Sequence, residues 1–232
     1  MCKVLSRDVL KIIAVLAMLI DHVGKLFFPE VLFLQILGRL AFPIFAFFIA
    51  EGFYYTKNKV KYLFTILVFA VIAQIPYNFL WHGLNVLFTF ICALVLLFLW
   101  EASKRLELAE KVILRIITCL VFFILSFLAL VLRIDYQWYG ILLPFVFYLF
   151  RERGLLKFLL FTILTVLFVV QLCCTVYPAI TFNTFIQTFA LLSILPLSFY
   201  DNQRKSNKKI KYLFYVFYPL HLVVLLCLTF VV

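Results

Sequence analysis

Lys11-Ile-Ile-Ala-Val-Leu-Ala-Met-Leu-Ile-Asp21-His22 is an apolar run with ionisable residues at both ends, and it decides the fold. Ten residues separate Lys11 from His22, so on a helix the two side chains project on nearly the same face. They lie roughly 16 Å apart along the helix axis, at about 1.5 Å per residue. Ionisable side chains inside a membrane-spanning helix are costly, and they therefore mark a candidate functional site.

The composition of the whole chain is that of a membrane protein. The chain has 232 residues, of which 67% are hydrophobic and 13% are charged, and its mean hydropathy is +1.18. Soluble domains contain about 25% charged residues. Because a helix satisfies its own backbone hydrogen bonds in lipid, we expect an all-α, polytopic transmembrane helical bundle. Nothing in the composition suggests a soluble domain, so residues 1–232 are expected to form a single membrane domain.

The length allows about nine spans (eight to ten) of roughly 20 residues each. Apolar runs and the turn signals between them place the spans near residues 9–28, 32–55, 60–80, 84–100, 112–132, 136–150, 155–173, 177–199 and 212–232. The sixth of these spans is short. The first begins like a signal peptide, but no small-residue cleavage site follows it, so we interpret it as a retained span.

The basic residues indicate which way the spans run. Of the 21 Lys and Arg residues, 18 fall in alternate loops or at the N-terminus. The positive-inside rule places those loops, and the N-terminus, in the cytoplasm. The net charge of +11 is therefore a topology signal, and we expect no nucleic-acid partner.

Several common chemistries have no signature in this chain. The six cysteines form no Cys-x-x-Cys pair and lack zinc-ligand spacing, so we expect no metal. A Gly-rich nucleotide loop, a Ser-centred elbow and a His-Glu-x-x-His helix are also missing from the sequence.

Polar residues gather in the outer half of the predicted membrane. His22 lies about six residues from the outer end of the first span and Arg39 about seven from the outer end of the second, each on the order of 10 Å below the boundary. We weigh a functional role above a structural one for both residues. Other polar residues predicted on that side are Gln74, Asn78, Asn85 and Thr89.

Three further ionisable residues enter the predicted spans. Lys11 stands at the cytoplasmic start of the first span and Glu51 about one turn from the end of the second. His221 lies near mid-depth in the last span, two residues after Pro219, where we expect a local opening that faces the bundle interior.

Structural roles remain open for most of these groups. Asp21 could neutralise Arg39 or Lys25, and it points about 100° away from His22 on a helix, so a bond between them is not assumed. The other structural alternatives are Lys11 as an anchor at the membrane surface, Glu51 as a partner of Lys57 or Lys59, and Asn78 as an interhelical hydrogen-bonding residue.

The residue types suit acyl transfer. A histidine can take a proton from an amine or hydroxyl near neutral pH, and a neighbouring carboxylate can orient it. A guanidinium can stabilise a developing oxyanion. Lys11 could bind a phosphate group from the cytoplasmic side.

Several runs of the sequence together resemble the TraX family. These are Lys11–His22, Leu37-Gly-Arg-Leu-Ala-Phe-Pro-Ile-Phe-Ala-Phe47, Glu51-Gly-Phe-Tyr-Tyr-Thr-Lys57, Asn85-Val-Leu-Phe-Thr89 and Tyr218-Pro-Leu-His221. The family is associated with N-terminal acetylation of conjugative pilin. The resemblance therefore implies a multi-pass protein of the bacterial cytoplasmic membrane.

TraX also resembles a wider superfamily of integral-membrane acyltransferases. That superfamily typically carries a basic residue, ten intervening residues and a histidine on its first helix, as Lys11 and His22 do. Its second helix often ends in Ser-Gly-Phe, but Glu51 replaces that serine here, which argues against a serine-based role. The resemblance implies acetyl-CoA as the donor, used from the cytoplasm, and an acceptor at the outer face.

We therefore expect a membrane-bound acetyltransferase acting on an amine or hydroxyl of a pilin-type N-terminus or an envelope glycan. The predicted catalytic residues are His22 as the base or, as the alternative, a transient acyl carrier, Asp21 to orient or tune it, and Arg39 to stabilise the oxyanion. Lys11 and Arg39 are predicted to hold the donor. The predicted chamber-lining residues are Glu51, Asn78, Asn85 and His221. A proton-coupled transporter or flippase is the alternative, and a membrane scaffold is the third hypothesis. The expected partners are membrane lipids and the acceptor.

Overall fold

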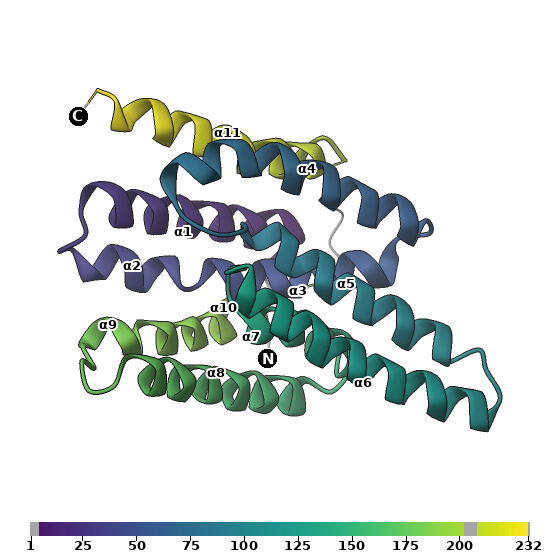
Figure 1. The fold of residues 1–232 in the computed structure, drawn as a ribbon. Helices are drawn as coiled ribbons and strands as arrows, with labels where there is room; N and C mark the ends of the chain where they lie inside the picture. The colour runs from purple at the N-terminus through teal and green to yellow at the C-terminus, as the bar shows by residue number, and fades with distance from the viewer. Residues whose placement is uncertain (1–4, 202–207, 232) are drawn as a thin grey trace. The chain divides into compact units, whose positions relative to one another are not determined.

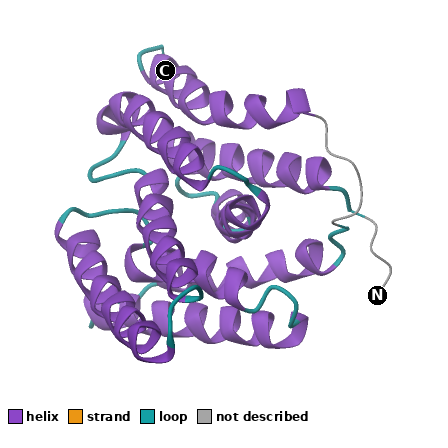
Figure 2. Cartoon of the chain, turned by 90° about the vertical axis from the view of Figure 1, so that its right-hand side faces the viewer, coloured by secondary structure: helices purple, strands orange, loops and turns teal. Residues whose placement is uncertain are grey.

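The structure, a computed structural model, describes residues 5–201 and 208–231. It is almost entirely helical, as Figure 2 shows. The described residues contain no β-strand and only two isolated β-bridges, Leu5–Tyr200 and Leu84–Ile134. The predicted all-α class is confirmed.

The helices follow the predicted spans closely. They are α1 (Arg7–Phe27), α2 (Leu32–Gly38), α3 (Ala41–Tyr55), α4 (Lys59–Leu80), α5 (Val86–Ser103), α6 (Leu108–Val131), α7 (Gln137–Leu149), α8 (Gly154–Val176), α9 (Phe182–Phe185), the 3-10 helix η1 (Ile186–Ser193), α10 (Ile194–Ser198) and α11 (Lys208–Thr229). Figure 1 shows their course. The sixth predicted span is indeed short, at 13 residues in α7.

Within the described residues, five helical segments are long and apolar enough to cross a membrane, and one of them is the joined pair α2–α3. The other four are α4, α5, α6 and α8. The remaining predicted spans correspond to α1 and to the shorter apolar helices Gln137–Leu149, Phe182–Ser198 and Tyr215–Thr229. The chain is therefore a multi-pass membrane protein. Its predicted orientation stays a prediction.

Two predicted spans are interrupted. The second breaks at Arg39 and Leu40, between α2 and α3. Pro43 has no backbone N–H, so the carbonyl of Arg39 lacks its usual helical donor there. The eighth span is built from α9, η1 and α10, with a tighter 3-10 segment in its middle.

The chain divides into two compact units. The first contains Met1–Phe45 and Phe150–Val232, and the second contains Ala46–Leu149. In the first unit α1 packs against α2 and α11, while η1 packs against α2 and α8. The buried residues of α1 recur every three or four positions and form one face: Leu10, Ala14, Ala17, Met18, Asp21 and Gly24. Because Asp21 lies on this face, α1 buries an ionisable side chain together with its apolar ones.

In the second unit α5 packs against α4, α6 and α7. Part of its core is formed by Leu96, Ala129, Ile134 and Ile141. The loop before α5 pairs with the loop before α7, because Leu84 N donates to Arg133 O (3.3 Å) and Asp135 N donates to Leu84 O (3.1 Å). Gly83 makes this pairing possible: its φ is +97°, and a Cβ there would lie 2.2 Å from Arg133 O.

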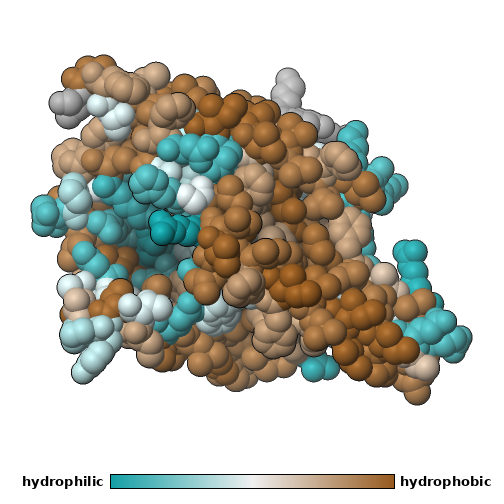
Figure 3. Space-filling view, in the orientation of Figure 1, coloured by the Kyte–Doolittle hydropathy of each residue, from teal (hydrophilic) through white to brown (hydrophobic). Residues whose placement is uncertain are grey.

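Large apolar side chains cover much of the surface, as Figure 3 shows for one face. Helix α6 is the extreme case, since Phe123 and Phe127 are each about two-thirds exposed (67% and 65%). Exposed apolar area of this extent marks contact with lipid or another apolar partner rather than water.

Candidate functional site

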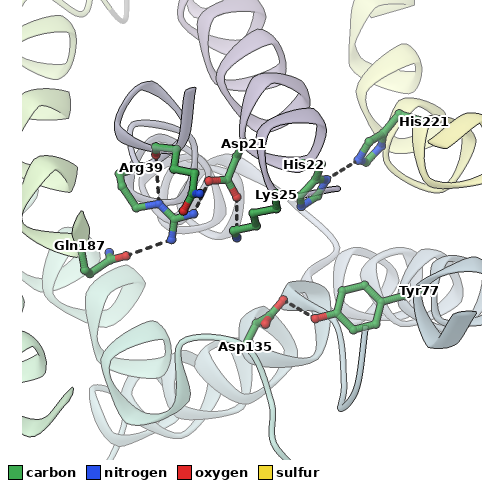
Figure 4. A network of polar contacts seen from close by, with 9 residues as sticks. Asp21, His22, Lys25, Arg39, Tyr77, Asp135, Gln187 and His221 are labelled. Carbon is green, nitrogen blue, oxygen red and sulfur yellow. Dashed lines mark hydrogen bonds and ion pairs between the residues drawn. The ribbon is translucent and has the colours of Figure 1, made fainter. Parts of the chain in front are cut away.

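An ionic cluster joins three elements of the first unit (Figure 4). Asp21 of α1 forms an ion pair with Arg39, and its other carboxylate oxygen lies 2.7 Å from Lys25 Nζ. The Arg39 guanidinium also donates from Nε to the Gln35 carbonyl (3.3 Å) and from Nη1 to Gln187 Oε1 (3.4 Å). Arg39 is thus oriented by acceptors from α1, α2 and η1.

Local sequence explains why Arg39 reaches Asp21. The break between α2 and α3 sets Arg39 at a helix end, and Gly38 precedes it. A Cβ on Gly38 would lie 2.3 Å from Asp21 Cβ, and one on Gly24 would lie 2.8 Å from Leu34 Cβ. The two glycines therefore allow α1 and α2 to approach closely enough for the ion pair.

Two histidines from the first and last helices meet beside this cluster. His22 Nδ1 lies 2.9 Å from His221 Nε2, and the two ring planes differ by 4°. His221 is 4% exposed, and its Nδ1 lies 3.0 Å from the carbonyl oxygen of Phe217. Helix α11 runs through Pro219 and carries His221 to α1.

This chain of contacts fixes the tautomer of both rings. A carbonyl oxygen can only accept, so Nδ1 of His221 must carry a hydrogen. In a neutral ring Nε2 of His221 is then the acceptor, and His22 must donate from Nδ1. A neutral His22 consequently presents its Nε2 as a lone-pair acceptor, which is the form that can take a proton.

The contacts of Asp21 are with Arg39 and Lys25. They describe a carboxylate that orients Arg39 rather than one that orients His22. The structural alternative, in which Asp21 neutralises Arg39 or Lys25, is what the contacts show. Two cations face one carboxylate, so the formal charge of these three groups is +1.

Glu51, Asn78 and Asn85 belong to the second unit. Asn85 is completely buried and caps α5: its Oδ1 accepts from Leu87 N (3.0 Å), while its amide donates to Ala70 O (3.0 Å) and Gln74 Oε1 (2.8 Å). Both amide hydrogens are used within the fold, so these contacts give Asn85 a structural role. Asn78 is exposed and accepts from Gln74, one helical turn away.

The remaining predicted site residues are Lys11 and Glu51. Lys11 is half-buried on α1, the same helix as His22, as predicted. Glu51 is 4% exposed in α3. Lys59, one suggested partner of Glu51, lies 3.8 Å from Glu101. Among the residues that the structure describes, no group of three or more His, Cys, Asp or Glu side chains could hold a metal ion.

Two groups were missed by sequence reasoning. Gln187 contacts Arg39 from η1, and Asp135 accepts from the Tyr77 hydroxyl (3.0 Å) within the second unit. Gln187 is one of several uncharged polar residues in the predicted span 177–199, so its residue type alone did not mark it as a partner of Arg39.

Comparison with known proteins places the chain in a family. A family model described as "TraX protein" matches residues 6–229. The chain belongs to the TraX family. Over 240 aligned residues this TraX member is 33% identical to a Dichelobacter nodosus protein named "Probable fimbrial assembly protein FimC, serogroup H1", covering 94% of this chain and 93% of that one.

A second relative of this TraX member is an uncharacterized protein of Rickettsia prowazekii (strain Madrid E). It is 44% identical over 69 residues, which cover 30% of this chain and 26% of that protein. No solved structure matches the chain.

Proposed function

We propose that this TraX family member is an acetyltransferase of the bacterial cytoplasmic membrane, moving an acetyl group from acetyl-CoA at the cytoplasmic side to an amine or hydroxyl at the outer face. The observation that carries the proposal is the contact between His22 and His221. It leaves His22 Nε2 ready to accept a proton, next to a guanidinium held in place by three acceptors.

In the reaction, the acceptor's amine or hydroxyl loses a proton to His22 Nε2 as its nitrogen or oxygen forms a bond to the acetyl carbonyl carbon. The carbon–sulfur bond then breaks, and the proton passes from His22 to the leaving thiolate. His221 is a positioning residue in this scheme: its Nε2 accepts from His22 Nδ1 and favours the imidazolium that forms.

Acetyl-CoA supplies the activated thioester. Two basic residues, Lys11 and Arg39, are the candidates for contacts with it. Lys11, on the same helix as His22, is the residue we assign to the phosphates of the donor. Arg39 was expected either to bind phosphate or to stabilise the oxyanion. Its contacts with Asp21 and Gln187 favour the second role, because they hold it in one fixed direction.

The relatives bear on the acceptor. The Dichelobacter protein is named for fimbrial assembly. The family resemblance described above implies pilin acetylation. We infer that the acceptor is a pilin-type N-terminus or an envelope glycan.

The test uses inverted membrane vesicles whose membranes contain the protein. Envelope material from cells that lack the protein is sealed in the vesicle lumen, which corresponds to the outer face of the membrane. With radiolabelled acetyl-CoA outside, wild-type vesicles should label an envelope component, which mass spectrometry would identify by its added acetyl group. His22→Ala should reduce labelling to background while its amount in the membrane is unchanged, because no other group replaces the base. Since proton abstraction contributes about 10²- to 10⁴-fold, the loss should be at least 100-fold.

His82→Ala is the matched control, since His82 is exposed in the loop after α4 and should be dispensable. Full activity of His22→Ala would contradict the assignment. A wild-type protein that transfers no acetyl group but carries a substrate in response to a pH gradient would favour the transporter alternative.

A further inference from the structure

Gln187 carries a buried donor that the fold does not use. The side chain lies in η1 and is 5% exposed. Its Nε2 has no hydrogen-bond partner among the described residues. Leaving such a group unpaired costs about 1–3 kcal/mol, so native structures rarely tolerate it without a use for it.

The neighbouring guanidinium fixes how the amide is turned. Arg39 can only donate, so the oxygen of Gln187, and not its nitrogen, must face Arg39 Nη1 (3.4 Å). Rotating the amide by 180° would place two donors against each other. The NH₂ group is therefore held facing away from Arg39 while its oxygen stays bound to it.

The surrounding charge selects the kind of atom that would accept from Nε2. The side chains of Asp21 and Arg39 are 8% and 12% exposed, whereas that of Lys25 is 37% exposed, so Arg39 is the buried cation beside Gln187. A buried guanidinium favours an oxygen that bears negative charge as its neighbour. An amide donor next to it adds direction to that attraction.

We propose that Gln187 Nε2 donates a hydrogen bond to a substrate oxygen that becomes negatively charged, beside the guanidinium of Arg39. The inference rests on the acyl transfer proposed above, in which that oxygen is the acyl carbonyl oxygen. When the nucleophile adds to the carbonyl carbon, the π electron pair moves onto this oxygen. The pair returns as the carbon–sulfur bond breaks and the thiolate leaves. Gln187 stabilises the charge between these two events.

Two variants separate the donor from the contact with Arg39. Gln187→Glu keeps an oxygen for Arg39 and replaces the donor with an acceptor, whereas Gln187→Leu removes both groups. In the vesicle assay each should lower kcat about 100-fold, the usual effect of losing one oxyanion donor. The KM for acetyl-CoA should change little, because the hydrogen bond strengthens only as charge develops.

Ser193→Ala is the matched control. Ser193 lies in the same 3-10 helix, is fully buried and also has a hydroxyl without a partner in the described part of the chain, but no contact links it to Arg39. Its kcat should stay near that of wild type. Full activity of Gln187→Glu, with wild-type transfer intact, would overturn the inference and leave the proposed function standing.

A second measurement does not need acetyl transfer. Sodium acetate, compared with sodium chloride at equal ionic strength, should raise the Tm of the purified wild-type protein and of Ser193→Ala in detergent, but not of Gln187→Leu or Gln187→Glu. If wild type transfers no acetyl group yet shows this acetate effect, the oxygen site stands and the proposed function fails. An acetate effect that is absent from wild type, or that survives in both Gln187 variants, counts against the site.

Discussion

Asp21 is the residue on which the ionic cluster depends. It is 6% exposed and holds two cations, Arg39 and Lys25, from two helices. Removing one partner of a buried ion pair destabilises a protein far more than replacing both partners with apolar residues, because it leaves a buried charge without compensation. At this position one substitution removes the carboxylate that is ion-paired with the buried Arg39 guanidinium.

We therefore expect Asp21→Asn to destabilise the protein by about 3–5 kcal/mol, the usual cost of breaking a buried pair. The measurement is the Tm of purified variants in detergent. Glu30→Gln, at an exposed carboxylate in the turn after α1, should leave the Tm unchanged. A Tm for Asp21→Asn equal to that of wild type would contradict a stabilising role for the ion pair between Asp21 and Arg39.

The sequence predicted the candidate residues better than their partners. It placed His22 and Arg39 at one depth, which stays a prediction, and the structure pairs Arg39 with Asp21, the residue next to His22. It did not pair His22 with His221, because these residues are 199 positions apart. The local sequence around each of them does not indicate which helices become neighbours. The cap that Asn85 forms on α5 was also not predicted, because a cap residue and a chamber residue look alike until the hydrogen bonds are known. Its predicted place in the chamber stays a prediction.

At the scale of elements, hydropathy predicted where helices lie but not where they break. The run of residues 32–55 is apolar enough on average to be predicted as one continuous span, so its mean hydropathy does not mark the break at Arg39 and Leu40. Pro43 was the available clue, since a proline disrupts the hydrogen bonds of the preceding turn. The break matters because it allows α2 to present Gly38 to α1.

Gly38→Ala tests this close packing. The added Cβ would lie 2.3 Å from Asp21 Cβ and 2.4 Å from Asp21 Oδ1, so α1 and α2 must separate and the ion pair with Arg39 must lengthen. We expect a fall in Tm and at least a tenfold loss of acetyl transfer, by the overpacking cost of about 1–3 kcal/mol and the displacement of Arg39.

Gly154→Ala is the control for that substitution. Gly154 begins α8, and a Cβ there would meet no atom within 4 Å. Alanine favours a helix over glycine, so this variant should be as stable as wild type or slightly more stable. Equal behaviour of the two alanine variants would show that the approach of α1 to α2 is not limiting.

At the scale of the whole molecule, the charge pattern predicts topology. Single cysteines can be placed at Lys104 and at His82 in a chain whose six native cysteines are changed to alanine. A membrane-impermeant maleimide added to intact cells should label the cysteine at 82 and not the one at 104, because basic loops stay in the cytoplasm. Labelling after lysis is the control for reactivity, and the reverse pattern would invert the proposed direction of transfer.

The whole-chain architecture could be predicted because lipid imposes it. Each predicted span found a helical counterpart, since a backbone in hydrocarbon has few alternatives to a helix. The grouping into two units could not be predicted, because it depends on side-chain shapes at contacts such as those between α1, α2 and α11.

The meeting of the first and last helices has a consequence for biosynthesis. His22 emerges early from the ribosome, while its partner His221 is 199 residues further along. At roughly 5–20 residues per second, about 10–40 s pass before the second histidine exists. Throughout that interval His22 lacks its partner. In the proposed reaction, the pair of histidines is therefore complete only after residue 221 has been synthesised.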